Sequence, residues 1–258
     1  METFQKVGSR QAIATEAGSL RWLAAVDGAA VARLRSVSTT WLTTALMDPG
    51  TPSREDAARF GRGLALTHAA GAAWWGQPPP GVAAKDLTLA ELPAPGADEP
   101  LWGSFGEFFA EARTRPYVEL ADFLPGEHRG LLHRACDIIG SGRFDAPQPA
   151  RCPEVARIHG DLWGGNVVWA SHGNHTVGTM IDACAHGGHA ETDLADLALF
   201  GSPHLDATIE GYNDVSPLAD GWRARVPVHQ FHKLLVHVVL FQGAYVPRAL
   251  DVAAWLVR

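Results

Sequence analysis

Apolar residues recur at two different spacings in the N-terminal part of the chain. Over residues 10–25 they return every three or four positions, which predicts an amphipathic helix. Residues 30–37 and 40–47 are instead rich in β-branched and apolar residues between turn signals, which predicts two strands. An Asp-Pro-Gly sequence at positions 48–50 then breaks the pattern. This first region is therefore expected to combine one helix with strands.

Helical spacing resumes after the break. Ser53 is followed three residues later by Asp56, so a capped helix is predicted to run from there to about residue 70. Residues 76–100 are rich in Gly, Pro and Ala and are predicted to form a long surface loop. Residues 141–153, with three prolines, are predicted to form a second loop.

The C-terminal half has the pattern of helices arranged around one hairpin. A short apolar segment at 155–158 precedes two predicted strands, 166–170 and 176–181, around a polar turn at 171–174. Further helices are predicted near residues 102–113, 127–140, 191–200, 227–245 and 248–257. A small helix-and-strand region followed by a mostly helical one indicates an α+β protein with two unequal lobes.

Composition narrows the class of protein. The chain has 258 residues, 47% of them hydrophobic, a formal net charge of -7 and a pI of about 5.9. Net acidity argues against a nucleic-acid partner. No apolar stretch reaches the ~18 residues that span a bilayer, and the N-terminus lacks the apolar core of a signal peptide. Three cysteines without a CxxC pair argue against a disulfide framework, so we expect a cytoplasmic protein with no membrane partner.

Two carboxylates and an amide stand at the spacing that phosphoryl transfer uses. Residues 159–166 are HGDLWGGN, and Asp182 follows at the end of an apolar strand. In kinases one carboxylate accepts the proton of the attacking alcohol, while an amide and a second carboxylate bind Mg²⁺ against the nucleotide phosphates. The spacing favours a kinase centre at Asp161, Asn166 and Asp182. A structural interpretation also stands, in which Asp161 and Asn166 cap turns of a Gly-rich loop.

The same run carries a resemblance to a known family. HGDLWGGN, followed by IDACAHGGHAETDLADLALFG at 181–201, resembles the fructosamine (ketosamine) kinases of the aminoglycoside phosphotransferase-like group. The resemblance extends to the C-terminal helices and covers essentially the whole chain. It implies a protein-kinase-like two-lobe fold. The truncated N-terminal lobe, residues 1–48, would bind nucleotide, and the mostly helical C-terminal lobe, residues 49–258, would hold the catalytic and substrate groups.

The resemblance implies a role for each residue of the centre. Asp161 would be the catalytic base, and Asn166 and Asp182 would be the Mg²⁺ ligands. Trp163 would lie beside the sugar, because sugar C–H faces stack on aromatic rings, although plain packing is its alternative. Two roles are equally open for Glu191: contact with the substrate, or capping of the helix that follows.

Five neighbouring residues are expected to support or modify the centre. His159 and Asp193 are expected to hold the catalytic loop by hydrogen bonds rather than to do chemistry. Asp196 is acidic where the family is usually apolar, and we expect it to affect stability. Ala183 replaces the family's proline but keeps the adjacent carboxylate, so metal binding could survive. Ala190 stands where the family often has arginine, which removes a charge near the substrate.

The nucleotide-binding residues are also implied by the resemblance. Lys6 would pair with the phosphates of ATP, and Glu16 on the first helix would orient it. Residues 44–47 would connect the lobes beside the adenine, with Met47 lining that pocket. The alternatives are a solvated lysine, a surface glutamate and a methionine that belongs to the core.

Lys6 lies only five residues from the start of the sequence, whereas the family has two strands and a phosphate-covering turn before this lysine. A misassigned start, a truncated chain and a protein without that turn all stay open. Such a turn supplies backbone amide donors to the phosphates. From the chain as printed we therefore expect weak ATP binding, or none.

The leading functional hypothesis is an ATP- and Mg²⁺-dependent phosphotransferase that phosphorylates a sugar hydroxyl of a small or protein-linked ketosamine during deglycation repair. Three alternatives stay open. The first is a kinase of another small molecule, such as an aminoglycoside, choline or a sugar. The second is a non-catalytic, kinase-like binding protein. The third is a metal hydrolase that uses His186, His189 and Asp182. The chain is expected to be a monomer or a homodimer.

Overall fold

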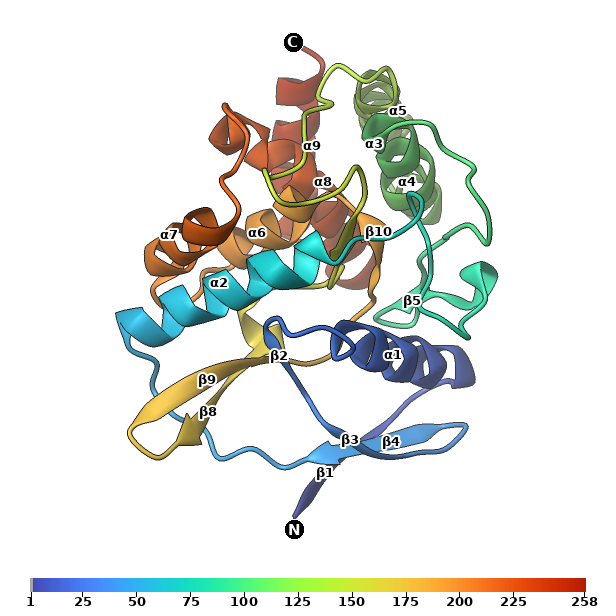
Figure 1. Ribbon diagram of the computed structural model, residues 1–258. Coiled ribbons are helices and arrows are strands. Elements are labelled where there is room, and N and C mark those ends of the chain that lie inside the picture. The colour runs from blue at the N-terminus through green and yellow to red at the C-terminus, as the bar shows by residue number, and fades with distance from the viewer. Residues whose placement is uncertain (1) are drawn as a thin grey trace.

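The computed structural model describes residues 2–258, and its N-terminal part is a small sheet covered by one helix (Figure 1). Strands β1 (Thr3–Val7), β4 (Trp41–Ala45) and β3 (Leu34–Val37) pair antiparallel in the order β1-β4-β3. Helix α1 (Arg10–Leu23) packs on this sheet through Ile13 and neighbouring apolar residues. The helix predicted over 10–25 is confirmed.

The predicted strand at 30–37 is wrong as a single element. Its first residues form β2 (Ala30–Val31), which pairs parallel with β9 (His175–Met180), while β3 joins the N-terminal sheet. Strand β9 also pairs antiparallel with β8 (Val167–His172), as the predicted hairpin requires. The segment 30–37 forms two strands because its first residues pair with β9 in one sheet and its last residues pair with β4 in another. This division ties the N-terminal region to the hairpin that carries Asp182.

Gly61 allows the helix after the break to approach a distant helix closely. Helix α2 (Arg54–Ala69) begins with the predicted capping box: Asp56 N donates to Ser53 Oγ, and Ser53 N donates to Asp56. Its partner α7 (Leu205–Val215) was not predicted. A Cβ atom on Gly61 would lie 2.0 Å from the Thr208 carbonyl oxygen, so the two backbones touch where side chains would not fit.

The prediction of a surface loop over residues 76–100 is only partly right. A 3₁₀ turn (Ala84–Asp86) and the short strands β5 (Thr88–Leu89) and β6 (Leu92–Pro93) interrupt it. Apolar side chains of this segment, among them Leu87, enter the larger hydrophobic core. Because these side chains are buried, the β5–β6 hairpin is anchored beside α1 and can form one wall of a cavity.

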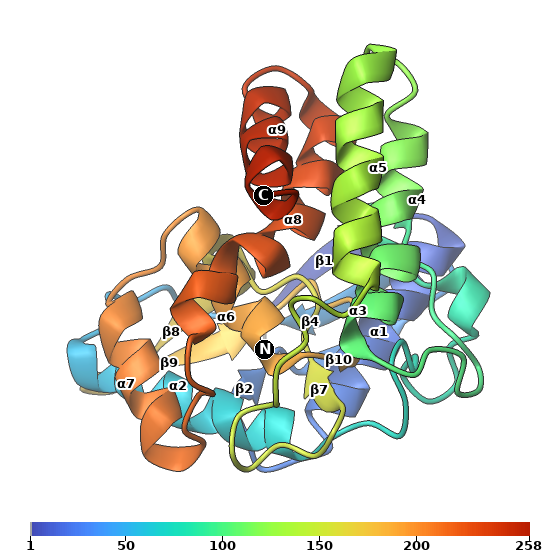
Figure 2. The same cartoon turned by 90° about the horizontal axis from the view of Figure 1, so that it is seen from above.

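In Figure 1 most of the helical part of the molecule lies above the β1-β4-β3 and β2-β9-β8 sheets, and Figure 2 shows the molecule from above. The segment predicted as one helix near 102–113 runs on to residue 120 through a π-helical turn. The helix predicted over 227–245 instead runs from Trp222 to Phe241, so Pro227 lies inside it and not at its first residue. The helices here are α3 (Phe105–Phe108), the π-helical turn (Phe109–Thr114), α4 (Arg115–Leu120), α5 (Gly126–Gly140), α6 (Ala190–Leu199), α8 (Trp222–Phe241) and α9 (Tyr245–Leu256).

Two further strands bring the segments with candidate chemistry together. Strand β7 (Ala156–Ile158) pairs antiparallel with β10 (His186–Gly188). The loop after β7 and the loop before β10 therefore run side by side, and a 3₁₀ turn (Gly164–Asn166) leads from the first loop into β8. Within residues 2–258, no helix is both long and apolar enough to cross a bilayer.

Candidate active site

The loop 159–166 is held from beneath by a buried carboxylate. Asp193, at the start of α6, accepts hydrogen bonds from the backbone amides of His159 (2.7 Å) and Gly160 (3.0 Å). His68 lies 3.0 Å from the same carboxylate. Burial opposes the charge of Asp193, but the bond to His68 and the His159 amide outweigh it and lower the carboxyl pKa. The prediction that Asp193 braces this loop is confirmed.

His159 joins the two loops of the site. Its Nδ1 atom accepts a hydrogen bond from the Asp161 amide (3.2 Å), so its Nε2–H donates to the Ile181 carbonyl (2.8 Å). The imidazole is fully buried, and burial lowers its pKa. A neutral His159 therefore ties the backbone of Asp161 to the residue before Asp182, which is the supporting role that the sequence predicted.

Asn166 orients the side chain of Asp161. The Nδ2 atom of Asn166 donates to the Asp161 carbonyl oxygen (2.8 Å) and to its Oδ2 atom (3.1 Å). The amide nitrogen is used in these bonds, which leaves the amide oxygen for a cation. The spacing of four residues between Asp161 and Asn166 thus creates a direct contact across one turn.

Asp182 is placed by an unusual backbone conformation. Its φ angle is 54°, in the left-handed region that costs a non-glycine residue about 1–3 kcal/mol. Lys6 compensates part of this cost, because its ammonium nitrogen lies 2.9 Å from Asp182 Oδ1. The Asp182 side chain is 40% exposed, so its second oxygen can reach a ligand. The strained turn aims the carboxylate into the cavity.

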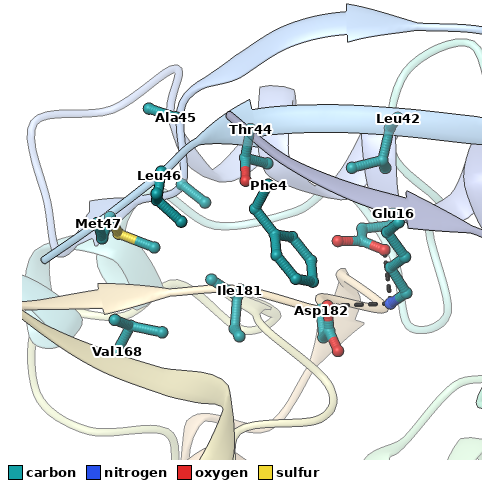
Figure 3. Close-up of a pocket in the computed structure, with 12 residues that line it drawn as sticks. Phe4, Glu16, Leu42, Thr44, Ala45, Leu46, Met47, Val168, Ile181 and Asp182 are labelled. Atoms are coloured by element: carbon teal, nitrogen blue, oxygen red, sulfur yellow. Dashed lines mark ion pairs between the residues drawn. The ribbon is translucent and has the colours of Figure 1, made fainter. Parts of the chain in front are cut away.

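Lys6 bridges two carboxylates from different elements. Its nitrogen also lies 2.7 Å from Glu16 Oε2 on α1, and dashed lines in Figure 3 mark both ion pairs. Burial opposes the charge of Lys6, but the carboxylates of Glu16 and Asp182 outweigh it and raise the ammonium pKa above its usual value. Lys6 is therefore a fixed cation at the floor of the cleft.

Two adjoining cavities meet at this cation. The first encloses about 210 Å³ and is mostly apolar, with Phe4 and Met47 pointing into it (Figure 3). The second encloses about 310 Å³ and is polar, with Asp161, Asn166 and Trp163 on its walls. Both cavities are lined by the same three charged residues, Lys6, Glu16 and Asp182. The arrangement suits an elongated ligand with an apolar end, an anionic middle and a polar reactive end.

The structure brings seven of the eight predicted site residues to these cavities. Trp163 lies 39% exposed on the wall of the polar cavity, with Phe200 at its edge. Glu191 is the exception, because its carboxylate is 2% exposed and does not line either cavity. It accepts two hydrogen bonds from Arg225 (2.6 and 2.9 Å) and lies 3.3 Å from His229. These partners lower the pKa of Glu191 to about 2 despite its burial.

The histidines of the hydrolase alternative are not brought to Asp182. The Nδ1 atom of His186 bonds to the Cys184 carbonyl (2.8 Å), and its Nε2 atom accepts from Arg113 (3.3 Å). His189 caps α6 by accepting a hydrogen bond from the Glu191 amide (3.2 Å). Both imidazoles are buried, and their ring nitrogens already have protein partners. Among the described residues, they form no metal-binding group with Asp182.

Two contributions to the site were missed by the sequence reasoning. The β5–β6 hairpin lines the polar cavity, and its Glu91 accepts a hydrogen bond from the Ser9 amide at the start of α1 (3.0 Å). Lys233 on α8 forms an ion pair with Asp161 Oδ1 from inside the protein. Each of these two residues could have been noticed in the sequence because it is a charged residue within a mostly apolar run: Lys233 in one run and Asp196 in another.

Comparison with solved structures defines the fold class. The ADP-bound aminoglycoside phosphotransferase APH(2'')-Ib aligns over 99% of this chain and 88% of its own, with a TM-score of 0.56 at 12% identity. The choline kinase LicA from Streptococcus pneumoniae gives a TM-score of 0.59 at 11% identity. At such identities the likeness concerns the fold alone. The predicted α+β, protein-kinase-like fold is confirmed.

Within this class, the chain belongs to the fructosamine kinase family, whose model matches residues 3–257. A crystal structure titled "putative fructosamine-3-kinase", from Thermobifida fusca, has a TM-score of 0.85 at 37% identity and aligns over 99% of this chain and 85% of its own. A "probable ketoamine kinase" from Klebsiella aerogenes is 33% identical over 65% of this chain, and the match spans 55% of that protein. Another from Vibrio vulnificus is 25% identical over 95% of this chain and 82% of its own length.

Proposed function

We propose that this protein is an ATP-dependent kinase that transfers a phosphoryl group to a sugar hydroxyl of a ketosamine. The observation that carries the proposal is the pair of cavities that meet at Lys6, Glu16 and Asp182. The apolar cavity suits a purine base, the cation suits the phosphates, and the polar cavity beside Asp161 suits the acceptor alcohol. Family membership supports the choice of a ketosamine as the acceptor.

Each group of the centre then has one task. Lys6 would bind the phosphates, and Glu16 holds its ammonium in place through the 2.7 Å ion pair. The Asp182 carboxylate and the Asn166 amide oxygen would hold Mg²⁺, whose preference for oxygen ligands fits this donor set. Bound there, the cation would neutralise the charge that develops on the phosphates.

Asp161 would act on the acceptor. Its side chain is 18% exposed at the polar cavity, and Asn166 fixes the orientation of its carboxylate. From this position it would accept the proton of the attacking hydroxyl as the new P–O bond forms and the bond between the γ-phosphorus and the bridging oxygen breaks, with ADP as the leaving group. Trp163 would align the sugar by stacking on its C–H face. A phosphate on the sugar would destabilise the adduct and release the amine, which is the basis of deglycation repair.

The proposal is tested by offering several acceptors to the purified protein with Mg·ATP. Candidates are a fructosamine, a ribulosamine, an aminoglycoside and choline at matched concentrations, with product phosphate assigned by ³¹P NMR. We expect transfer to the ketosamines alone. Transfer to the aminoglycoside or to choline instead would reassign the substrate. Nucleotide binding without transfer to any acceptor would favour the alternative of a non-catalytic binding protein.

A further inference from the structure

Asp161 is bound from behind by a lysine on a distant helix. Lys233 lies in the middle of α8, is 1% exposed, and forms an ion pair with Asp161 Oδ1. A second carboxylate, that of Asp196 on α6, lies 3.6 Å from the same ammonium nitrogen and is fully buried. The Lys233 ammonium group is thus shared by two carboxylates: the buried Asp196 and Asp161, which lines the polar cavity.

The geometry shows which carboxylate the lysine serves. Among the described residues neither oxygen of Asp196 has a hydrogen-bond partner, and its distance from Lys233 exceeds hydrogen-bonding range. A lysine that only neutralised Asp196 would be expected to bond to it directly, because burying an unsatisfied carboxylate is costly. The ammonium group instead contacts Asp161, which lines the cavity.

The two oxygens of Asp161 consequently have different surroundings. Lys233 bonds to Oδ1, and Asn166 donates to Oδ2 at 3.1 Å. These two donors come from opposite parts of the fold and fix the plane of the carboxylate. The ammonium group of Lys233 occupies Oδ1. Oδ2 accepts only the neutral amide bond from Asn166, so Oδ2 is the oxygen that can accept a substrate proton.

We propose that Lys233 is a positioning residue for phosphoryl transfer: it holds Asp161 so that Oδ2 meets the acceptor hydroxyl, and Asp196 is the buried counter-charge that makes a lysine tolerable there. The inference rests on the proposed function, because it takes Asp161 as the base. It adds a residue from outside the catalytic loop, which acts on the acceptor side and not on the nucleotide.

The test separates positioning from charge neutralisation by removing the lysine together with its counter-charge. Lys233→Met alone strands the Asp196 carboxylate without a cation and is expected to lower the melting temperature. The double variant Lys233→Met/Asp196→Leu leaves no unpaired charge at those two positions and is expected to recover the melting temperature, because apolar groups can replace a buried ion pair. Its kcat should still fall by about 10²-fold, the scale of a misplaced reacting group. Its KM for ATP should stay within about twofold, because Lys6, Glu16 and Asp182 are untouched.

Recovery of both the melting temperature and kcat in the double variant would overturn the inference, because Lys233 would then serve only to neutralise Asp196. A further arm adds the double change to Asp161→Asn. No additional loss of kcat is expected there, and an additional 10²-fold loss would show that Lys233 does not act through Asp161. Failure of the proposed function looks different: the unaltered protein would not turn over, or Asp161→Asn would stay active. Either result removes the base and the inference with it.

Discussion

The ammonium nitrogen of Lys6 lies 2.9 Å from the Oδ1 atom of Asp182, and both residues of this ion pair line the two adjoining cavities. Lys6 belongs to the first strand and Asp182 follows β9, so the contact joins the small sheet to the hairpin. It gathers a cation and a carboxylate at the point where nucleotide phosphates would lie. The first two predictions concern this pair.

Replacing Lys6 by methionine should weaken nucleotide binding. The change keeps most of the side-chain volume but removes the cation that would face the phosphates, and it leaves Glu16 and Asp182 without their shared partner. We expect the Kd for ATP to rise by about tenfold or more, the usual cost of a hydrogen bond to a charged group. Calorimetric titration measures it. Lys85→Met, at an exposed lysine on the 3₁₀ turn, is the matched control and should bind as the unaltered protein does.

Asp182→Ala should affect Mg·ATP and free ATP differently. The substitution removes a carboxylate that would bind the cation, but it also frees Lys6 from one of its two ion pairs. Affinity for Mg·ATP should therefore fall, while affinity for ATP in the presence of a chelator should hold or rise. Two titrations, with and without Mg²⁺, check this. Equal losses in both would mean that Asp182 contributes only to the shape of the site.

Asp161→Asn should slow turnover strongly and spare nucleotide binding. Asparagine keeps the shape of the side chain but cannot accept the acceptor proton, and general-base catalysis contributes about 10²–10⁴-fold. We expect kcat to drop on that scale while the Kd for ATP is maintained, since Asp161 lines only the polar cavity. Asp251→Asn, at an exposed position on α9, is the control. Retained turnover in Asp161→Asn would refute its assignment as the base.

Local sequence was enough to predict the features whose partners are near in the chain. The capping box joins Ser53 to Asp56, three residues apart, and the bond between Asp161 and Asn166 spans five positions. The capping box was predicted from residue types and spacing. The same kind of reasoning placed Asp161 and Asn166 in one centre, although it did not predict the hydrogen bond between them. The family resemblance extended this reach to Lys6, Glu16 and Met47, which the structure places on the apolar cavity.

Features that depend on distant segments were not predictable in this way. The pair Lys233–Asp161 joins positions 72 residues apart, and β2 is a strand only because β9 supplies its hydrogen bonds. Helix α7 contains Gly211, which looks like a helix breaker in the sequence. In the fold this glycine lets α7 touch α2, since a Cβ atom there would lie 2.0 Å from the Ala58 carbonyl oxygen. These residues are needed for contacts with segments distant in the chain, so the neighbouring sequence does not reveal their role.

Stability should fall as the pH drops below about 6.5, although burial raises the pKa of the Asp196 carboxyl to about 7 and so opposes the trend by up to one proton. Burial lowers the pKa of five of the buried histidines: His159, His186, His189, His229 and His232. The unfolded chain therefore binds more protons than the folded protein, and the free energy of unfolding decreases with falling pH. Each group contributes up to about 1.4 kcal/mol per pH unit. Urea unfolding at about pH 7.5 and about pH 5.5 measures the slope.

His189→Asn is the control for this prediction. The pKa of His189 is lowered to about 3, and asparagine preserves its role as the N-cap of α6. Between the same two pH values, the free energy of unfolding of the variant should change less steeply with pH. The difference in slope corresponds to one proton, or up to about 1.4 kcal/mol per pH unit. A free energy of unfolding that stays constant between the two pH values in the unaltered protein would contradict the buried, neutral state of these imidazoles.

Two glycine-to-alanine changes should move stability in opposite directions. Gly61→Ala would place a methyl group 2.0 Å from the Thr208 carbonyl, so α2 and α7 must separate, at a cost of about 1–3 kcal/mol. Gly130→Ala, within α5, meets no atom nearer than Arg134 Nη1 at 3.6 Å. It should stabilise by about 0.5–1 kcal/mol, because alanine loses less backbone entropy in a helix. Chemical denaturation of both variants measures the two effects, and a neutral Gly61→Ala would mean that the α2–α7 contact is looser than the structure shows.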